Sequence, residues 1–439
     1  MDVLIKIAQF VLSLSILIVL HELGHFVFAR IFKTRVEKFY LFFDAGFSLF
    51  KKKIGETEYG IGWLPLGGYV KISGMIDESM DREQMKQPPQ PWEFRSKKAW
   101  QRLLIMLGGV TVNFLLALVI YILVFFRWGD EYIPVEQITD GYTFDSTFID
   151  LGFRNGDRIL FLDGKPVEKW LSIHHDLVVN ETRVVTVERN GSELDVAIPE
   201  ERFSEILKLE FPIAPRIPFE LAGMREDGGA AKAGMKLGDK ILRIDGDEVR
   251  FFDELRSKLG GAPHKDFQVQ VLRGTDTLDL VVQTDANGMF GIENKGLYDY
   301  FDPVVVKYSF LQSVPAGIQR GVDITKSYVK QLKLLFKPKT KAYEELGGFI
   351  RIGSIFSPTW DWQSFWNMTA FLSIILAIMN ILPIPALDGG HVMFLLYEMV
   401  SGRKPGDKFM EYAQIVGMVL LLSLLLYANL NDVIGLFRK

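Results

Sequence analysis

Four long apolar stretches restrict the fold of this 439-residue chain more than any other feature. Residues 103–126, 365–387 and 412–430 carry no charged side chain, and the stretch at 3–29 has charges only near its two ends. Each stretch is close to the roughly 20 residues that a helix needs to cross the hydrocarbon core of a bilayer. Because a bilayer offers the backbone no hydrogen-bond partners, the sequence predicts a polytopic α-helical membrane protein. Its four transmembrane helices are expected at 1–30, 99–127, 363–388 and 410–432.

Composition agrees with this class and excludes several others. The mean hydropathy is +0.15 and 49% of the residues are hydrophobic, more than a soluble protein requires. There are no cysteines, which excludes thiolate catalysis, disulfides and cysteine zinc sites and leaves histidine and carboxylate as metal ligands. The net charge of −4 gives no indication of a nucleic-acid partner.

A His-Glu-x-x-His motif ends the first apolar stretch, at His21, Glu22 and His25. Residues four apart share a face of a helix, so the two histidines can present their ring nitrogens to one metal ion. Glu22 is close enough to hold a metal-bound water and take its proton. The alternative is a helix end at the membrane interface whose histidines are ordinary hydrogen-bonded polar residues. Such polar groups are costly in a membrane helix, which favours the metal site.

A second polar group lies in the third apolar stretch, which ends in the sequence Asn-Ile-Leu-Pro-Ile-Pro-Ala-Leu-Asp-Gly-Gly-His at 380–391. Pro383 and Pro385 are expected to end or kink the helix there. Asp388 is then a carboxylate in an apolar run and the predicted third ligand, because catalytic zinc sites commonly use three protein ligands. The alternative is a helix-capping aspartate. His391 is expected to face away from the site.

Eight basic residues lie at or next to the two membrane ends of the loop at 31–98, namely Arg30, Lys33, Arg35, Lys38, Arg95, Lys97, Lys98 and Arg102. The positive-inside rule places that loop in the cytoplasm, the N-terminus and the region at 127–364 outside, and the metal motif near the cytoplasmic face. Aromatic and β-branched residues with glycines at 58–71 predict short strands or a hairpin, close enough in sequence to the metal helix to lie against it. A surface hairpin without a role is the alternative. Residues 77–91 are expected to form an exposed loop.

An internal repeat occupies the outside region. Residues 151–167 align without gaps to residues 233–249. Each segment has one Gly-Asp pair and one Asp-Gly pair, and both pairs stand at the same aligned positions. A period this long fits two copies of a small domain, at 128–214 and 215–302. The pattern resembles α+β PDZ domains, which bind extended peptides, often their C-terminal ends, at a sheet edge. Rigid spacer domains are the alternative. Residues 303–362 then form a juxtamembrane region with an amphipathic helix near 309–336.

The two metal motifs in separate membrane helices, with PDZ-like copies between them, resemble the site-2 protease family of intramembrane zinc metalloproteases (peptidase M50). The tandem copies and four spans are similar to its bacterial regulator of sigma-E protease branch. The resemblance implies that Zn²⁺ is held by His21, His25 and Asp388 and that Glu22 is the general base. It also implies a membrane-reentrant hairpin at 61–72. The family's Gly-Gly-Pro-Ile-Gly-Ile stretch is replaced here by Gly-Gly-Phe-Ile-Arg-Ile at 347–352, and no role is carried onto it.

The resemblance further implies regulated intramembrane proteolysis, in which single-pass membrane proteins such as anti-sigma factors, or remnant signal peptides, are cut after a first cut outside. The expected location is the bacterial inner membrane, and the expected partners are these substrates, the bilayer and peptide ends. The candidate substrate-binding residues are Asn380, Pro383, Pro385, Gly67, Gly68 and Tyr69. A membrane-anchored PDZ adaptor with a structural metal site is the main alternative, and a metal transporter is a weaker one.

Overall fold

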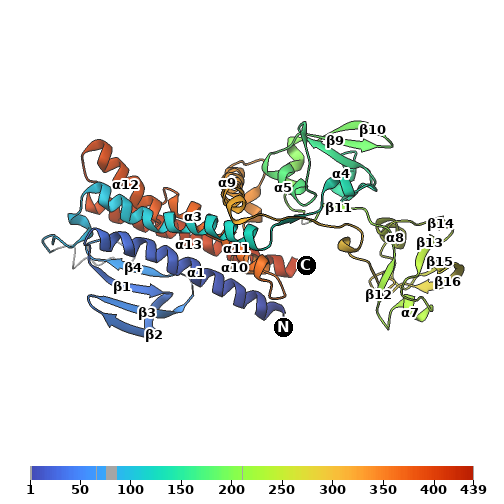
Figure 1. The fold of residues 1–439 in the computed structure, drawn as a ribbon, viewed down its shortest axis with the longest axis horizontal. Helices are drawn as coiled ribbons and strands as arrows, with labels where there is room; N and C mark the ends of the chain where they lie inside the picture. The colour runs from blue at the N-terminus through green and yellow to red at the C-terminus, as the bar shows by residue number, and fades with distance from the viewer. Residues whose placement is uncertain (1, 66, 76–86, 210, 439) are drawn as a thin grey trace. The chain divides into compact units, whose positions relative to one another are not determined.

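A computed structural model describes residues 2–65, 67–75, 87–209 and 211–438 of the chain. It forms two compact units (Figure 1). One unit, called the membrane unit here, comprises residues 1–129, 307–336 and 343–439. The other, called the repeat unit, comprises residues 130–306 and 337–342.

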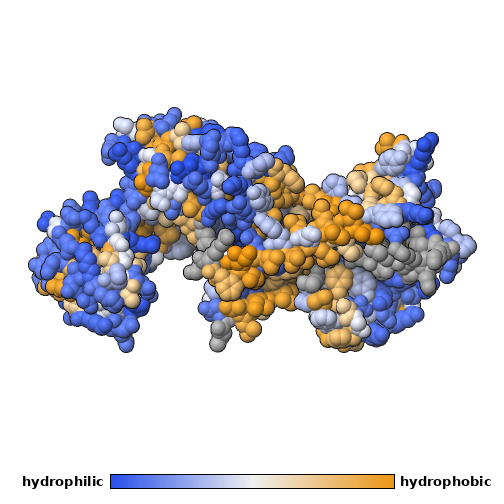
Figure 2. Space-filling view, turned by 180° about the vertical axis from the view of Figure 1, so that it is seen from behind, coloured by the Kyte–Doolittle hydropathy of each residue, from blue (hydrophilic) through white to orange (hydrophobic). Residues whose placement is uncertain are grey.

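Four helices of the membrane unit are long and apolar enough to cross a membrane, as predicted. Figure 2 shows hydrophobic residues over this unit, whereas the surface of the repeat unit is mostly hydrophilic. Apolar side chains on the outside of a helical bundle suit a lipid environment, because lipid tails solvate them. The four helices are α1 (Asp2–Ile31), α3 (Ala99–Arg127), α11 (Trp362–Ile381) and α13 (Asp407–Arg438).

Helix α3 is the centre of the bundle and packs on both α1 and α11. A β-carbon on Gly24 of α1 would lie 2.3 Å from the carbonyl oxygen of Gly108, so only glycine allows the two backbones to meet there. Helix α9 (Phe310–Leu335), the predicted amphipathic helix, also packs on α3. A β-carbon on its Gly317 would lie 2.6 Å from the Ile122 nitrogen.

The third spanning helix is shorter than the predicted span at 363–388, because α11 ends at Ile381. Residues 382–387 form a turn, and α12 (Asp388–Ser401) begins at the candidate ligand. Pro383 lacks an N–H for the helix and disfavours helical geometry in the residue before it, which explains the break. An ion pair of 2.5 Å between Arg102 and Glu398, both largely buried, ties α12 to α3.

The loop after α1 forms a four-stranded sheet, β1 (Val36–Leu41), β2 (Phe43–Ile54), β3 (Thr57–Leu64) and β4 (Tyr69–Ile72), in the order β2-β3-β1-β4. The predicted hairpin at 61–72 is therefore wrong, because β1 lies between β3 and β4. The parallel pairing of β1 with β3 places Phe39 beside Tyr59, and both rings pack on Phe26 of α1. The true hairpin joins β2 and β3. Residues 77–86 of the predicted exposed loop lie outside the described residues.

The repeat unit contains two four-stranded sheets with equivalent strand orders, β10-β9-β7-β8 and β14-β13-β15-β16. Strands β7 (Arg158–Leu162) and β13 (Lys240–Ile244) begin 82 residues apart, the period of the sequence repeat. The buried Asp157 accepts hydrogen bonds from Arg189 just before β7, and the buried Asp239 accepts them from Arg273 just before β13. The two halves therefore share element order and a supporting ion pair.

Each half of the repeat unit also has its own core of buried aromatic and aliphatic side chains. The ends of the unit meet where β5 (Asp130–Tyr132) pairs with β18 (Val304–Val306). The remaining strands are β6 (Tyr142–Phe144), β8 (Lys165–Pro166), β9 (Val184–Arg189), β10 (Ser192–Ala197), β11 (Ile213–Pro215), β12 (Leu221–Met224), β14 (Asp247–Glu248), β15 (Asp266–Arg273), β16 (Asp276–Gln283) and β17 (Ile292–Asn294). The shorter helices are α4 (Ser146–Asp150), α5 (Ser172–Val179), α6 (Phe203–Ile206), α7 (Gly229–Lys232), α8 (Phe252–Leu259), α10 (Phe349–Ser354) and the 3₁₀ turns at 94–96, 135–137, 200–202, 297–299 and 342–345.

Candidate metal centre

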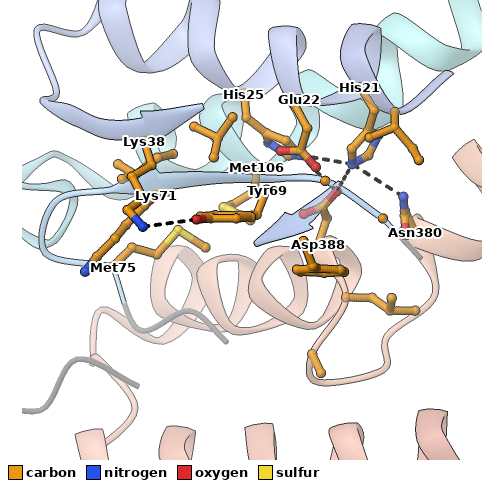
Figure 3. A pocket seen from close by; sticks show the side chains of 18 of the residues that line it. His21, Glu22, His25, Lys38, Tyr69, Lys71, Met75, Met106, Asn380 and Asp388 are labelled. Atoms are coloured by element: carbon orange, nitrogen blue, oxygen red, sulfur yellow. Dashed lines mark hydrogen bonds and ion pairs between the residues drawn. The ribbon is translucent and has the colours of Figure 1, made fainter. Parts of the chain in front are cut away.

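Three buried or largely buried side chains from two helices meet inside the membrane unit (Figure 3). His21 and His25 extend from α1, and Asp388 points toward them from the first residue of α12. The two Nε2 atoms are 3.2 Å apart, and Oδ2 of Asp388 is 3.2 Å from each of them. The structure therefore brings together the three predicted ligands in an equilateral triangle of donor atoms.

This triangle fits a tetrahedral zinc ion. Ligand atoms about 2.0–2.1 Å from zinc lie about 3.3 Å from one another in a tetrahedron, close to the three observed separations. Oδ2 of Asp388 is buried and has no hydrogen-bond partner of good geometry among the described residues. A buried carboxylate oxygen left in that state is costly, whereas a cation shared with two imidazoles would satisfy it. Three protein ligands also leave a fourth position for water.

Helix α3 supports both histidines from behind. Nδ1 of His25 donates to the carbonyl oxygen of Ile105 at 2.9 Å. Nδ1 of His21 lies 3.1 Å from Nδ2 of Asn113, and turning that amide by 180° gives its buried Oδ1 the place of acceptor for an Nδ1–H of His21. Partners at Nδ1 fix the ring orientation and leave Nε2 free to bind a metal. The rings lie directly on Gly109, where a β-carbon would be 2.5 Å from Nε2 of His25 and 2.6 Å from Cε1 of His21.

The turn at 382–387 holds Asp388 in a tightly constrained backbone. Ala386 has a φ of +82°, a conformation that costs a residue other than glycine about 1–3 kcal/mol. A β-carbon on Gly389 would lie 2.1 Å from the Leu382 carbonyl oxygen, so glycine is needed after Asp388 for α12 to fold back on the turn. The Asp-Gly-Gly sequence therefore places the carboxylate at the start of α12, whose first turn packs directly on the backbone of the turn at 382–387.

A cavity of about 800 Å³ opens beside the triangle. Glu22 lines this cavity and lies on the same turn of α1 as the two histidines. Its carboxylate contributes no atom to the triangle. A backbone hydrogen bond from Val70 in β4 reaches the Glu22 carboxylate. The arrangement places the Glu22 carboxylate next to the three triangle atoms, and such a set of groups can activate a metal-bound water.

The predicted substrate-binding residues divide into two groups. Gly67, Gly68, Tyr69 and Asn380 line the cavity, and the side-chain amide of Asn380 lies 3.4 Å from Nε2 of His21. Pro383 and Pro385 are not among the residues that line it; they end α11 and shape the turn. His391 does line the cavity, so the expectation that it faces away is wrong, although it does not join the triangle.

Tyr69 belongs to a small polar network with Asp44 and Lys38, which also line the cavity. Its hydroxyl donates to Asp44 at 2.9 Å, and Lys38 lies 3.4 Å from the same carboxylate. Burial and the hydrogen bond to Asp44 raise the pKa of Tyr69 above its usual value, so the hydroxyl remains a neutral donor. Burial alone would raise the pKa of Asp44, but the hydrogen bond from Tyr69 and the charge of Lys38 lower it.

Sequence reasoning missed Asn113, Gly109 and Gln414, although all three contribute to the centre. Asn113 is fully buried and Gln414 is 5% exposed, and both are amides within spanning helices. Polar side chains in such helices usually face the interior of the bundle and have a function, which was a usable signal. Gly109 carried a weaker signal, the glycine pair at 108–109 in an apolar run.

Comparison with known proteins identifies the family. The profile of peptidase family M50 matches residues 9–424, nearly the whole chain. The chain belongs to peptidase family M50. It is 28% identical to the regulator of sigma E protease of Haemophilus influenzae, over 99% of this chain and 100% of that protein. It is also 28% identical to the regulator of sigma-E protease RseP of Escherichia coli, over 97% of this chain and 98% of that protein.

A further relative, from Vibrio cholerae, has a name that describes it as a zinc metalloprotease; it is 29% identical over 98% of this chain and 99% of that protein. Family membership and these relatives confirm the predicted enzyme class, a zinc-dependent metalloprotease. The triangle of His21, His25 and Asp388 is a set of residues that suits that cofactor.

Proposed function

We propose that this chain is an intramembrane metalloprotease that cuts single-pass membrane proteins within or near the bilayer. The observation that carries the proposal is the position of the triangle on α1 and α12, next to Glu22 and inside a bundle of four membrane-length helices. A cavity among membrane-length helices would give water access to a peptide bond that lipid would otherwise keep from it. His21, His25 and Asp388 hold zinc, and Glu22 is the general base.

Hydrolysis requires one water, one base and a way to stabilise charge on the substrate carbonyl. When bound, zinc supplies a water of lowered pKa and polarises the carbonyl. Glu22 accepts a proton from the attacking water and passes it to the leaving amine as the carbon–nitrogen bond breaks. Asn380 offers a neutral N–H donor beside His21, where it can bind a substrate carbonyl oxygen.

Strand β4 is suited to hold the substrate in an extended form. A helical substrate hides its carbonyls in its own hydrogen bonds and must unwind before it is cut. Among the described strands β4 pairs only with β1 and so lies at an edge of the sheet, and its residues Tyr69–Ile72 line the cavity, as Glu22 does. Pairing with this edge would replace the hydrogen bonds lost on unwinding.

Substitution of Gly68 by valine is expected to reduce cleavage about tenfold or more while bound zinc is unchanged. A β-carbon at Gly68 would lie 2.6 Å from Ile18 and 2.7 Å from the Tyr40 carbonyl oxygen, so valine forces β4 away from α1. The three atoms nearest this β-carbon position belong to Ile18, Tyr40 and Glu22 and not to the three ligands, which is why zinc should remain. Cleavage of a tagged substrate and zinc content by atomic absorption measure both effects.

Gly435→Val is the matched control, because nothing lies within 4 Å of its β-carbon position. A native rate for Gly68→Val would contradict this role of β4.

The repeat unit is proposed to be a pair of PDZ-like domains outside the cytoplasm, at 128–214 and 215–302, and the chain to lie in a bacterial inner membrane. A groove of about 240 Å³ in the second half supports peptide binding there. Apolar Leu255 and Leu259 of α8 line it together with residues 290–292, and Arg256 can attract a terminal carboxylate, whereas Arg225 already pairs with Asp285 at 2.6 Å. The pair would favour substrates already trimmed outside, including anti-sigma factors and remnant signal peptides.

The proposal is tested with purified full-length protein in proteoliposomes and two tagged single-pass substrates, one with a folded external domain and one trimmed to a short tail. We expect zinc-dependent cleavage of the trimmed substrate at a bond inside its apolar segment, located by mass spectrometry. Cleavage should stop with a chelator and return with added zinc. The substrate with the folded domain should be cut at least about tenfold more slowly, because bulk outside prevents access.

Two results would redirect the proposal. A cut only in the soluble tail of the substrate would retain the protease and exclude intramembrane cleavage. Binding of both substrates without any cleavage would favour the adaptor alternative, in which the metal has a structural role.

A further inference from the structure

Gln414, on the fourth spanning helix, is a buried polar side chain that the proposed chemistry does not use. Its Oε1 accepts a hydrogen bond from the backbone N–H of Ala386 at 3.2 Å. Ala386 lies in the turn between α11 and α12, two residues before the third ligand. We propose that Gln414 is a positioning residue for Asp388, and that α13 thereby fixes the carboxylate for metal binding. The inference rests on the proposed role of Asp388 as a ligand.

The backbone at Ala386 gives the first reason. Its φ of +82° is one that alanine disfavours, so the turn must be held by its surroundings. The hydrogen bond from Ala386 to Gln414 is a contact of this kind, because rotation of the backbone toward negative φ would turn the N–H away. Such a rotation would also move Asp388, whose Oδ2 is now 3.2 Å from both histidines.

A second contact places α13 against the same turn. A β-carbon on Gly417, one helical turn after Gln414, would lie 1.7 Å from the carbonyl oxygen of Pro385. Backbone therefore meets backbone, with the glutamine hydrogen bond beside it. These contacts are specific to the turn at 382–387, whereas α13 is otherwise lightly packed and exposes much of its length.

The opposite end of α13 is fixed separately, which provides a control. Asn431 donates to the carbonyl oxygens of Glu344 and Leu346 at 2.8 and 3.0 Å, and Asp432 accepts from the Arg351 backbone at 2.9 Å. Loss of the Asn431 contacts loosens α13 without touching the turn beside Asp388. If Gln414 only held α13 in place and did not position Asp388, loss of the Gln414 contact and loss of the Asn431 contacts should have the same effect on metal binding.

The test measures metal affinity of the full-length protein in detergent, by competition with a zinc chelator, and the visible absorption of the Co²⁺-loaded protein. Gln414→Leu is expected to weaken zinc binding about 10–100-fold and to alter the Co²⁺ spectrum, as loss of groups that orient ligands does elsewhere. Adding Ala386→Gly should recover most of the lost affinity, because glycine adopts positive φ readily. Gly417→Ala, which displaces the turn directly, should resemble Gln414→Leu. Asn431→Leu should retain native affinity.

Native affinity and a native Co²⁺ spectrum in both Gln414→Leu and Gly417→Ala would overturn the proposal. So would an equal loss in Asn431→Leu, or a loss in Gln414→Leu that Ala386→Gly does not relieve. If Gln414→Leu fails to fold, Gly417→Ala carries the test. Asp388→Asn separates this inference from the function on which it rests. If that variant binds zinc normally, the ligand assignment fails; if it loses zinc while Gln414→Leu does not, only the positioning role fails.

Discussion

Replacing Glu22 by glutamine is expected to lower the rate of peptide-bond cleavage by about 10²–10⁴-fold while the protein keeps its zinc. The amide has nearly the shape of the carboxylate but cannot accept the proton of the attacking water. Zinc should remain because the three triangle atoms come from His21, His25 and Asp388 and none comes from Glu22. The measurement is kcat for the trimmed single-pass substrate in proteoliposomes, with bound zinc determined on the same sample.

Two variants complete the experiment with Glu22→Gln. Glu56→Gln makes the same substitution at an exposed turn of the sheet and should leave both rate and zinc unchanged. Asp388→Asn should lose zinc and cleavage together, because an amide is a poor substitute for a carboxylate ligand. Equal rates for the native protein and Glu22→Gln would mean that another group accepts the proton. Absence of cleavage by either, with substrate bound, would favour the adaptor.

That His21, His25 and Asp388 meet could be predicted because such side chains are uncommon in an apolar sequence. Two histidines four residues apart share a helix face whatever surrounds them, and Asp388 was a carboxylate in a run with no other charge. The four spans followed from length and hydropathy, which depend on the bilayer and not on the partner helices. In each case a local property of the chain decided the structure.

The sheet after α1 shows where local reasoning fails. Residues 61–72 have strand composition, and β3 and β4 both form, but composition does not say which strands pair. The pairing depends on Phe39 of β1 and Tyr59 of β3, which pack together on Phe26 of α1. These contacts place β1 between β3 and β4. His391 illustrates the same limit: spacing along α12 suggested that it faces away, but the turn before Asp388 sets how that helix is rotated.

The residues that support the ligands could not be predicted in detail, since they depend on which helix faces meet. Asn113 contacts His21 across 92 positions of sequence, and Gln414 contacts Ala386 across 28. The polarity of each residue indicated a buried role, but no periodicity names the partner. Gly109 is the extreme case, because a residue without a side chain becomes informative only when its neighbours are known.

Gly109→Ala is expected to reduce zinc affinity more than about 100-fold, since it acts on two ligands at once. The added methyl group would lie 2.5 Å from Nε2 of His25, and 2.6 and 2.8 Å from Cε1 and Nδ1 of His21. Contacts that short are not tolerated, and α3 cannot retreat easily because Gly24 and Gly108 already hold it against α1 by their backbones. The two imidazoles must therefore move, and the equal separations of the triangle are lost.

The control for this prediction is the same substitution where space is free. A β-carbon on Gly435 meets nothing within 4 Å, and alanine is favoured over glycine in a helix by about 1 kcal/mol, so Gly435→Ala should keep zinc and fold at least as well. Zinc affinity by chelator competition and thermal unfolding of both variants separate the two possible causes of lost activity. Lower zinc affinity in Gly109→Ala with a helical far-UV spectrum would locate the damage at the ligands. Native zinc affinity in Gly109→Ala would show that the two histidines can be displaced without loss of the metal, which would contradict their role as ligands held against α3.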